Sequence, residues 1–167
     1  IGLPDIKNYT RSDYKGGTQN WAIDQDKNGN LYFANNNGLF QFDGTTWRSY
    51  KMSNADAIRC VKIDPSGKIY VGEYNEFGYF KPNEKGRLIY HSLTHLVTKA
   101  KIKTIDFIWK VHLFNKGVVF QAFSKAFYLK NNTIQTIKAP KRFQFSFLVN
   151  GRLYLQDIAN GLLEYKN

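Results

Sequence analysis

Gly29-Asn30-Leu31-Tyr32 is the first of four copies of one short pattern, in which a glycine and a spacer precede an aliphatic and an aromatic residue. The other copies are Gly67-Lys68-Ile69-Tyr70, Gly117-Val118-Val119-Phe120 and Gly151-Arg152-Leu153-Tyr154. A small residue with an apolar pair follows each copy: Gly38-Leu39-Phe40, Gly78-Tyr79-Phe80, Ala126-Phe127-Tyr128 and Gly161-Leu162-Leu163. The first glycines lie 38, 50 and 34 positions apart, so the chain repeats a unit of about 40 residues.

Repeats of this length that contain short strands are typical of a β-propeller. In the first unit, residues 20–25 alternate as a strand, and the turn sequence Asp26-Lys27-Asn28-Gly29 follows. Further turns at residues 35–38 and 43–44 separate three more strands. We therefore predict an all-β propeller of about four blades, each a four-stranded antiparallel meander. The predicted blades are residues 20–52, 58–92, 107–138 and 143–167.

Two of the segments outside these blades carry further predictions. Residues 93–106 form an insertion, where the spacing of Leu93, Leu96 and Val97 predicts a short helical turn. The fourth unit ends before an outer strand, and residues 1–10, through Asp5-Ile6-Lys7-Asn8-Tyr9, could supply a closing strand for it. The chain then forms either a small closed ring or part of a larger propeller.

The composition bounds the class of protein. The 167 residues are 43% hydrophobic and 16% aromatic, enough for the core of one domain. The net charge of +11 includes lysine-rich stretches at 99–103 and 138–142. Its lysines either protect exposed sheet edges or form a surface for acidic ligands, such as uronic or sulfated sugars. Direct binding of nucleic acid is not expected, because no known binding module accompanies the charge.

Other sequence signals are expected to be absent. The single cysteine, Cys60, cannot form an internal disulfide. No run of about 18 apolar residues predicts a membrane span, and no signal peptide is recognised at the amino terminus.

Three stretches carry a family resemblance: Pro4-Asp5-Ile6-Lys7-Asn8-Tyr9, residues 14–23 (YKGGTQNWAI) and residues 32–47 (YFANNNGLFQFDGTTW). They resemble the amino-terminal sensor region of Bacteroidetes hybrid two-component systems and related membrane-spanning transcriptional regulators, which carry two-component-regulator propeller repeats. The resemblance covers residues 4–80. It weakens beyond them, where Phe123-Ser124-Lys125-Ala126 replaces the usual asparagine–glycine turn.

The resemblance implies a large periplasmic propeller. In that family a triple-tyrosine immunoglobulin-like module often follows, and then a membrane helix and a cytoplasmic histidine kinase or DNA-binding domain. The chain is therefore expected to be a fragment of a sensor propeller. Its expected partners are the remaining blades and the downstream signalling domains of the parent chain.

The loops that enter the first strand of each blade, and those that join its second and third strands, meet at one mouth of a propeller. Amides and carboxylates beside aromatic rings suit a sugar there, because hydroxyls take directional hydrogen bonds and the C–H face of the sugar stacks on a ring. We therefore predict an oligosaccharide ligand, and the net positive charge is compatible with an acidic oligosaccharide. The predicted ligand-binding residues are Asn20, Trp21, Asn35, Asn36, Asn37, Glu73, Tyr74, Asn75, Trp109, Lys110 and Asp157.

Alternatives to a ligand sensor remain open. Glu73, Glu76 and Asp157 could form the paired carboxylates of a glycoside hydrolase, although no enzyme activity or catalytic residue is predicted for this chain. His91 and His95 have the spacing of a helical metal pair but lack an evident third ligand, so neither a metal nor a cofactor is predicted. The competing hypothesis is a structural or protein-interaction propeller with no small ligand. A large apolar patch, or a dimer formed through the unpaired blade edge, would favour it.

Overall fold

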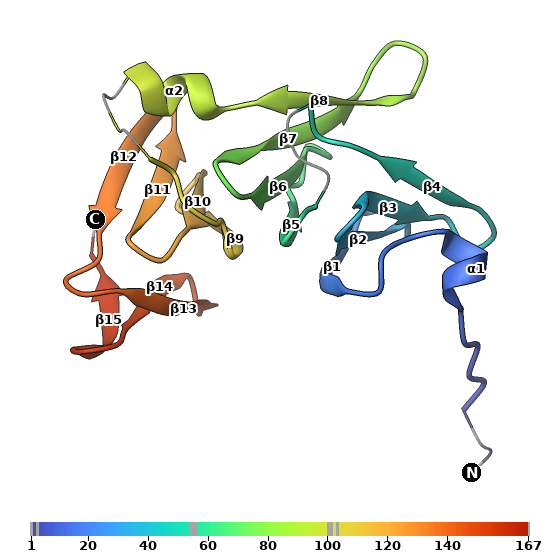
Figure 1. Ribbon diagram of the computed structural model, residues 1–167, viewed down its shortest axis with the longest axis horizontal. Coiled ribbons are helices and arrows are strands. Elements are labelled where there is room, and N and C mark those ends of the chain that lie inside the picture. The colour runs from blue at the N-terminus through green and yellow to red at the C-terminus, as the bar shows by residue number, and fades with distance from the viewer. Residues whose placement is uncertain (1, 3, 54–56, 100–101, 103, 167) are drawn as a thin grey trace.

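Four antiparallel sheets follow one another along the chain and are arranged as the blades of a β-propeller (Figure 1). This computed structural model describes residues 2, 4–53, 57–99, 102 and 104–166. Within each blade the strands pair in chain order, as a meander does. Blades 1, 2 and 3 have four strands each, and blade 4 has three. The predicted all-β propeller is confirmed.

The strands of blade 1 are β1 (Asn20–Gln25), β2 (Leu31–Asn35), β3 (Gly38–Phe42) and β4 (Trp47–Tyr50). Those of blade 2 are β5 (Cys60–Ile63), β6 (Ile69–Glu73), β7 (Glu76–Pro82) and β8 (Leu88–Ser92). Those of blade 3 are β9 (Lys110–Phe114), β10 (Gly117–Gln121), β11 (Lys125–Lys130) and β12 (Thr133–Lys138). Those of blade 4 are β13 (Phe143–Val149), β14 (Arg152–Asp157) and β15 (Gly161–Tyr165). The described residues also form two short helices, α1 (Arg11–Tyr14), before blade 1, and α2 (Thr94–Lys99), in the insertion.

The hydrophobic core is divided among the interfaces between consecutive blades. The inner strands β1, β5, β9 and β13 pack side by side in chain order around the centre (Figure 1). Each buried cluster joins apolar side chains of two neighbouring blades, for example Tyr32 with Val71, Phe77 with Phe120, and Tyr128 with Leu153. Because a single strand face is too small to form a core by itself, each blade depends on its neighbours for burial.

The aromatic residue of the repeated pattern faces the next blade in the first two copies. Tyr32 packs in the cluster between blades 1 and 2, and Tyr70 packs in the cluster between blades 2 and 3. In blade 3, Phe120 faces back toward blade 2, and Val119 faces forward toward blade 4. The third copy is therefore out of register with the others.

A turn shifted by one residue explains the difference. In blade 4 the turn residues with positive φ are Asn150 (48°) and Gly151 (74°). In blade 3 they are Asn115 (44°) and Lys116 (60°), and Gly117 already belongs to β10. Lys116 thus corresponds to Gly151, and the sequence alignment of the third copy on Gly117 is wrong by one position. Since side chains alternate along a strand, a shift of one residue reverses the face that each occupies.

The segment before blade 1 packs against that blade. Residues 4–10 form no strand, so the closing strand considered from the sequence is not present in this structure. The Tyr9 ring instead lies 5.0 Å from Phe42 and 5.6 Å from Trp47. The Tyr14 ring lies 5.5 Å from Trp47 and 6.0 Å from Phe40. These aromatic contacts hold the segment on the outer part of blade 1.

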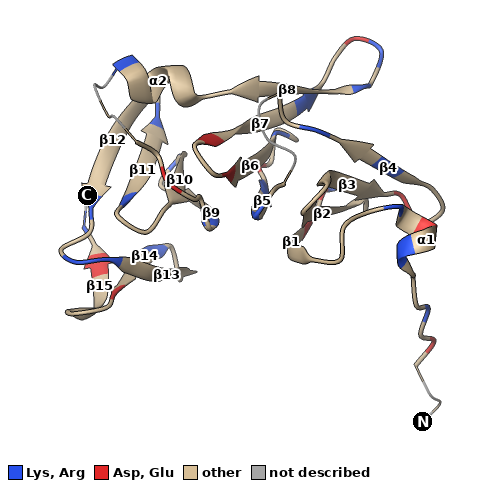
Figure 2. Cartoon of the chain, viewed as in Figure 1, with Lys and Arg blue, Asp and Glu red and all other residues tan. Residues whose placement is uncertain are grey.

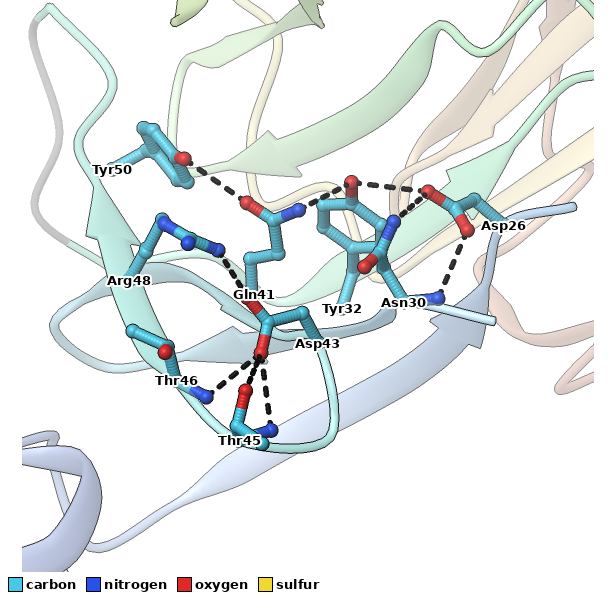
Figure 3. A network of polar contacts seen from close by, with 9 residues as sticks. All are labelled: Asp26, Asn30, Tyr32, Gln41, Asp43, Thr45, Thr46, Arg48 and Tyr50. Atoms are coloured by element: carbon cyan, nitrogen blue, oxygen red, sulfur yellow. Dashed lines mark hydrogen bonds and ion pairs between the residues drawn. The ribbon is translucent and has the colours of Figure 1, made fainter. Parts of the chain in front are cut away.

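A row of side-chain hydrogen bonds crosses blade 1 (Figure 3). The Tyr50 hydroxyl donates to Gln41 Oε1 (3.0 Å), and Gln41 Nε2 donates to the Tyr32 hydroxyl (3.1 Å). Tyr32 in turn donates to Asp26 Oδ2 (3.3 Å) in the β1–β2 turn. Burial and the nearby Asp26 carboxylate raise the pKa of Tyr32, so its hydroxyl keeps the proton that it donates. The row ties the turn to the outer strand and has a structural role.

One face of blade 4 is left uncovered. Leu153 and Leu155 face blade 3 and are buried there, and the buried Ser146 of β13 also faces blade 3. By strand alternation, the neighbours of these residues lie on the opposite face. We call it the uncovered face of blade 4, and it carries four exposed apolar side chains: Phe145, Phe147, Val149 and Leu162.

Lysine and arginine are distributed over all four blades and do not gather on one of them (Figure 2). Of the lysine-rich stretch 99–103, residues 100, 101 and 103 lie outside the described part of the chain. The stretch 138–142 consists of the last residue of β12 and the connection to β13. None of the described helices is long and apolar enough to cross a membrane.

Candidate functional site at the propeller mouth

The loops that were expected to form a mouth are joined by backbone hydrogen bonds. The amide of Ile58, in the loop entering blade 2, donates to the carbonyl of Asn35 in blade 1 (2.9 Å). The amide of Trp109 donates to the carbonyl of Gln121 (2.8 Å), and the amide of Phe143 to that of Phe123 (2.7 Å). These hydrogen bonds fix the position of the backbone from which the side chains of each entering loop extend into the mouth.

Five side chains from blades 1, 2 and 3 form what we call the mouth cluster: Trp21, Arg59, Phe107, Trp109 and Phe123. The Arg59 guanidinium lies 4.6 Å from the Trp21 ring and 4.8 Å from each of the Phe107 and Trp109 rings. The Trp109 ring also contacts Phe123, with 5.1 Å between ring centroids. Cation–π attraction to three rings therefore holds Arg59 at the centre of the cluster.

An acidic partner balances the charge of Arg59. Its Nε atom lies 2.9 Å from Glu73 Oε2, and the two side chains are only 18% and 9% exposed. The contact is an ion pair whose alignment falls short of a hydrogen bond. Removing either partner would leave a largely buried charge without its counter-charge, which is strongly destabilising. We therefore infer that Glu73 stabilises the mouth cluster by pairing with Arg59.

A cavity of ≈ 400 Å³ opens beside the cluster. Trp21 lies at its rim, and its indole Nε1 donates to Asn36 Oδ1 (2.7 Å), which orients the ring. Trp21 remains 36% exposed, so one part of the ring is accessible to a ligand. The cavity is lined by aromatic, basic and amide side chains: Trp21, Arg59, Trp109, Lys110, Phe123, Gln144 and Phe145.

The repeat explains how these side chains come together. In each blade, one pair between the inner strand and the second strand is equivalent: Ala22 with Ala34, Cys60 with Gly72, Lys110 with Gln121, and Phe145 with Gln156. The residue directly before this pair on the inner strand is Trp21, Arg59, Trp109 or Gln144, so these four side chains occupy the same position in their blades. Four equivalent positions around a propeller converge on its axis. Trp21 and Trp109 are among the residues predicted from the sequence, whereas Arg59, Phe107, Phe123 and Gln144 are not. A position-by-position alignment of the repeats could have found Arg59 and Gln144.

Three of the predicted site residues share a second equivalent position, at the end of the second strand: Asn35, Glu73 and Asp157. All three are buried. Asn35 Oδ1 accepts from the amide of Gly17 (2.8 Å), and Asn35 Nδ2 donates to Asn20 Oδ1 (2.7 Å). Each of the three residues thus fixes the loop that enters its own blade. They position the mouth rather than line its cavity.

Asp157 does this through a set of amide donors. Its Oδ2 accepts from the backbone amides of Lys141 and Arg142 (2.9 Å each), and its Oδ1 accepts from the side-chain amide of Asn160 (2.7 Å). Burial alone would raise the pKa of Asp157, but these hydrogen bonds lower it to about 2. Glu76 is likewise buried and accepts from the hydroxyl of Tyr90 (2.8 Å). The carboxylates considered for glycan hydrolysis are therefore engaged in structural contacts.

Tyr74 and Asn75 lie at the edge of the mouth cluster. The Tyr74 ring is 54% exposed and lies 4.8 Å from the Phe107 ring, which extends the row of aromatic side chains. Asn75 Oδ1 accepts from the backbone amides of Ile105 and Asp106 (3.3 Å each), so Asn75 holds the end of the insertion. The exposed predicted residue Asn37 does not line the cavity.

Lys110 lines this cavity and a second one of ≈ 480 Å³ deeper along the inner strands. Lys62 and His112 also line the second cavity. Lys62 is paired with Asp24 (3.0 Å). Burial, and then the charge of Lys110, lowers the pKa of His112 to about 4. Lys110 itself is exposed and forms no ion pair with the described part of the chain.

The fold and the mouth define a β-propeller with an aromatic, cation-rich cavity at one end. Virginiamycin B lyase from Staphylococcus aureus, in a catalytically inactive form with quinupristin, shares the fold with a TM-score of 0.67 and 15% identity over 90% of this chain. The extracellular domains of two hybrid two-component systems from Bacteroides thetaiotaomicron match with TM-scores of 0.66 and 0.63. Their identities are 16% and 14%, over 91% and 87% of this chain.

This chain spans 56% of the lyase and 20% and 22% of the two extracellular domains. At these identities the likeness shows the propeller fold. No protein-family model and no curated protein matches the chain. The similar structures include an enzyme and sensor domains, so the fold by itself does not decide the function.

Proposed function

We propose that this chain is part of the periplasmic ligand-sensing propeller of a membrane-spanning signalling regulator. In this proposal it belongs to the family of two-component-regulator propellers that its sequence resembles. The likeness to extracellular domains of Bacteroides two-component systems supports it. The remaining blades and the output domains of the parent, such as a histidine kinase or a DNA-binding domain, are its partners.

The ligand is an oligosaccharide breakdown product bound at the mouth cluster. The observation that carries this assignment is the cavity itself, where exposed ring surface lies next to basic and amide side chains. A sugar ring can stack on Trp21 or Trp109 while its hydroxyls bond to Gln144. The cavity volume of ≈ 400 Å³ is within the range of small-molecule sites.

Signalling follows from differential binding. Trp21, Arg59 and Trp109 belong to three different blades and touch one another at the mouth. A ligand that contacts several blades favours the arrangement of blades in which all contacts form, and the equilibrium shifts toward that state. The membrane-spanning part of the regulator would transmit this change of conformation to the output domain.

The test is calorimetric titration of the parent sensor region with a panel of glycan oligosaccharides. We expect one class to bind, and Trp21→Ala to weaken its affinity by about tenfold through loss of stacking. Trp47→Phe is the matched control, because Trp47 packs against Phe42 far from the cavity. Absence of binding across the panel, or equal losses in both variants, would contradict the proposal.

The second candidate is a propeller that binds other proteins and no small ligand. The uncovered face of blade 4 favours it, because contiguous exposed apolar side chains often mark an interface. Sedimentation analysis separates the two candidates: a homodimer that is lost on Phe147→Ser, without glycan binding, supports this one. Glycan cleavage that is lost on Glu73→Gln or Asp157→Asn, in variants whose thermal unfolding matches that of the unmodified protein, would instead indicate an enzyme.

A further inference from the structure

The lining of the mouth cavity has an unbalanced charge. Its basic side chains are Arg59 and Lys110, its neutral polar side chain is Gln144, and the other lining residues are aromatic. No carboxylate is among these lining residues. The cavity wall therefore presents two positive charges, and the carboxylate of Glu73, which pairs with Arg59, lies outside this lining.

The two basic side chains are not equivalent. Arg59 is covered by three rings and paired with Glu73, so its charge is already balanced. Lys110 is exposed and has no ion-pair partner among the described residues. Lys110 is thus the lining residue whose charge remains available to a ligand.

A second lysine and a histidine line the deeper cavity together with Lys110. Lys110 lines both the mouth cavity and the deeper cavity, where Lys62 and His112 are its neighbours. Burial is the main cause of the lowered pKa of His112, and the charges of Lys110 and, to a smaller extent, Lys62 add to it. Asp24 balances Lys62 but forms no ion pair with Lys110.

We infer that the sugar bound at the mouth carries an anionic group, a carboxylate or a sulfate, which Lys110 holds at the junction of the two cavities while the sugar ring lies against Trp109 and Trp21. The inference rests on the proposed function, since it specifies the ligand of the same site. A charge-assisted contact to Lys110 distinguishes an acidic sugar from a neutral one of the same shape, because only the acidic sugar gains from it.

The experiment compares matched ligands on the parent sensor region. Uronic-acid oligosaccharides, their carboxyl-reduced neutral counterparts and sulfated oligosaccharides are titrated at low and moderate salt. We expect the unmodified protein to bind one acidic series at least about tenfold more tightly than the neutral counterpart, with affinity falling as salt rises. The uronic and sulfated series show which of the two anionic groups is recognised.

Lys110→Gln is expected to lower the affinity for the acidic series to about that for the neutral sugar, which removes the preference. Lys85→Gln is the matched control, because it removes the same charge from the exposed β7–β8 turn. Thermal unfolding of both variants should match the unmodified protein, so a loss of binding would not reflect misfolding.

The outcomes separate the two proposals. If neutral and acidic sugars bind equally well, or if Lys110→Gln and Lys85→Gln have equal effects, the inference about charge is wrong while the sugar-sensing proposal stands. If no sugar of any series binds, both are wrong. An acidic preference lost only in Lys110→Gln supports the inference.

Discussion

Blades 3 and 4 are built alike but differ in what covers them. Both begin with two strands joined by a two-residue turn with positive φ at both positions. In blade 3 both faces are buried, with Phe120 on one side and Tyr128 on the other. In blade 4 only the face toward blade 3 is buried, and Phe147 on the other face is 46% exposed. The alternation of apolar residues along a strand therefore indicates which side chains can be buried. Whether they are buried depends on the presence of a neighbouring blade on that face.

The boundary between these two blades also differs from the others, because a polar chain crosses it. The Ser146 hydroxyl of blade 4 donates to Gln121 Oε1 of blade 3 (3.0 Å). His112 Nε2 lies 2.9 Å from Ser146 Oγ, and since that hydroxyl proton points to Gln121, His112 is the donor. All members of a buried polar chain must be satisfied, so this contact specifies one way of docking blade 4.

The largest expected effect tests the two faces directly. Phe120→Ala removes a side chain buried between blades 2 and 3 and should lower the free energy of unfolding by about 3–5 kcal/mol. Phe147→Ala, at the uncovered face of blade 4, should change it by no more than about 0.5 kcal/mol. Urea unfolding followed by circular dichroism measures both. A comparable loss for Phe147→Ala would show that this face is covered in solution.

A smaller effect concerns the polar boundary. Burial lowers the pKa of His112 from 6.5 to about 4, so the folded protein binds fewer protons than the unfolded chain between these values. The neutral His112 side chain should therefore make its full contribution to the free energy of unfolding above pH 6.5. This contribution, up to about 3 kcal/mol, should be lost as the pH falls toward 4. The measurement is the unfolding free energy as a function of pH.

The control for this pH dependence is the exposed His95 of α2. His112→Gln keeps a donor for Ser146 but cannot titrate, so it should flatten the stability profile between pH 6.5 and 4. His95→Gln should leave the slope as it is. If both variants retain the slope, groups other than His112 cause the acid sensitivity.

The smallest effect sharpens the comparison of the two turns. Lys116 has a φ of 60°, a region that costs a non-glycine residue about 1 kcal/mol, and blade 4 has Gly151 at this position. Lys116→Gly should therefore stabilise the protein slightly, by up to about 1 kcal/mol, and Gly151→Ala should destabilise it by a similar amount. Thermal unfolding measures both shifts. A loss of stability in Lys116→Gly would contradict the one-residue correction of the repeat alignment.

The sequence alone predicted the propeller because glycine turns and short apolar strands recur about every 40 residues. It failed at Gly117, since a glycine inside a strand resembles a turn glycine until the pairing of β9 with β10 is known. The predicted helical turn of the insertion corresponds to α2, whereas residues 4–10 form no strand and Tyr9 packs on blade 1 instead. A turn is determined by a few consecutive residues, whereas the partner of a strand depends on residues elsewhere in the chain.

For the site, the sequence indicated which loops and which residue types meet at the mouth, because strand order and turn positions follow from the repeat. Only the tertiary structure separated the residues that line the cavity, Trp21, Trp109 and Lys110, from those that hold the loops, Asn35 and Asp157. It also brought in Arg59. The physical reason is that burial and charge pairing depend on neighbours from other blades, which lie far apart along the chain.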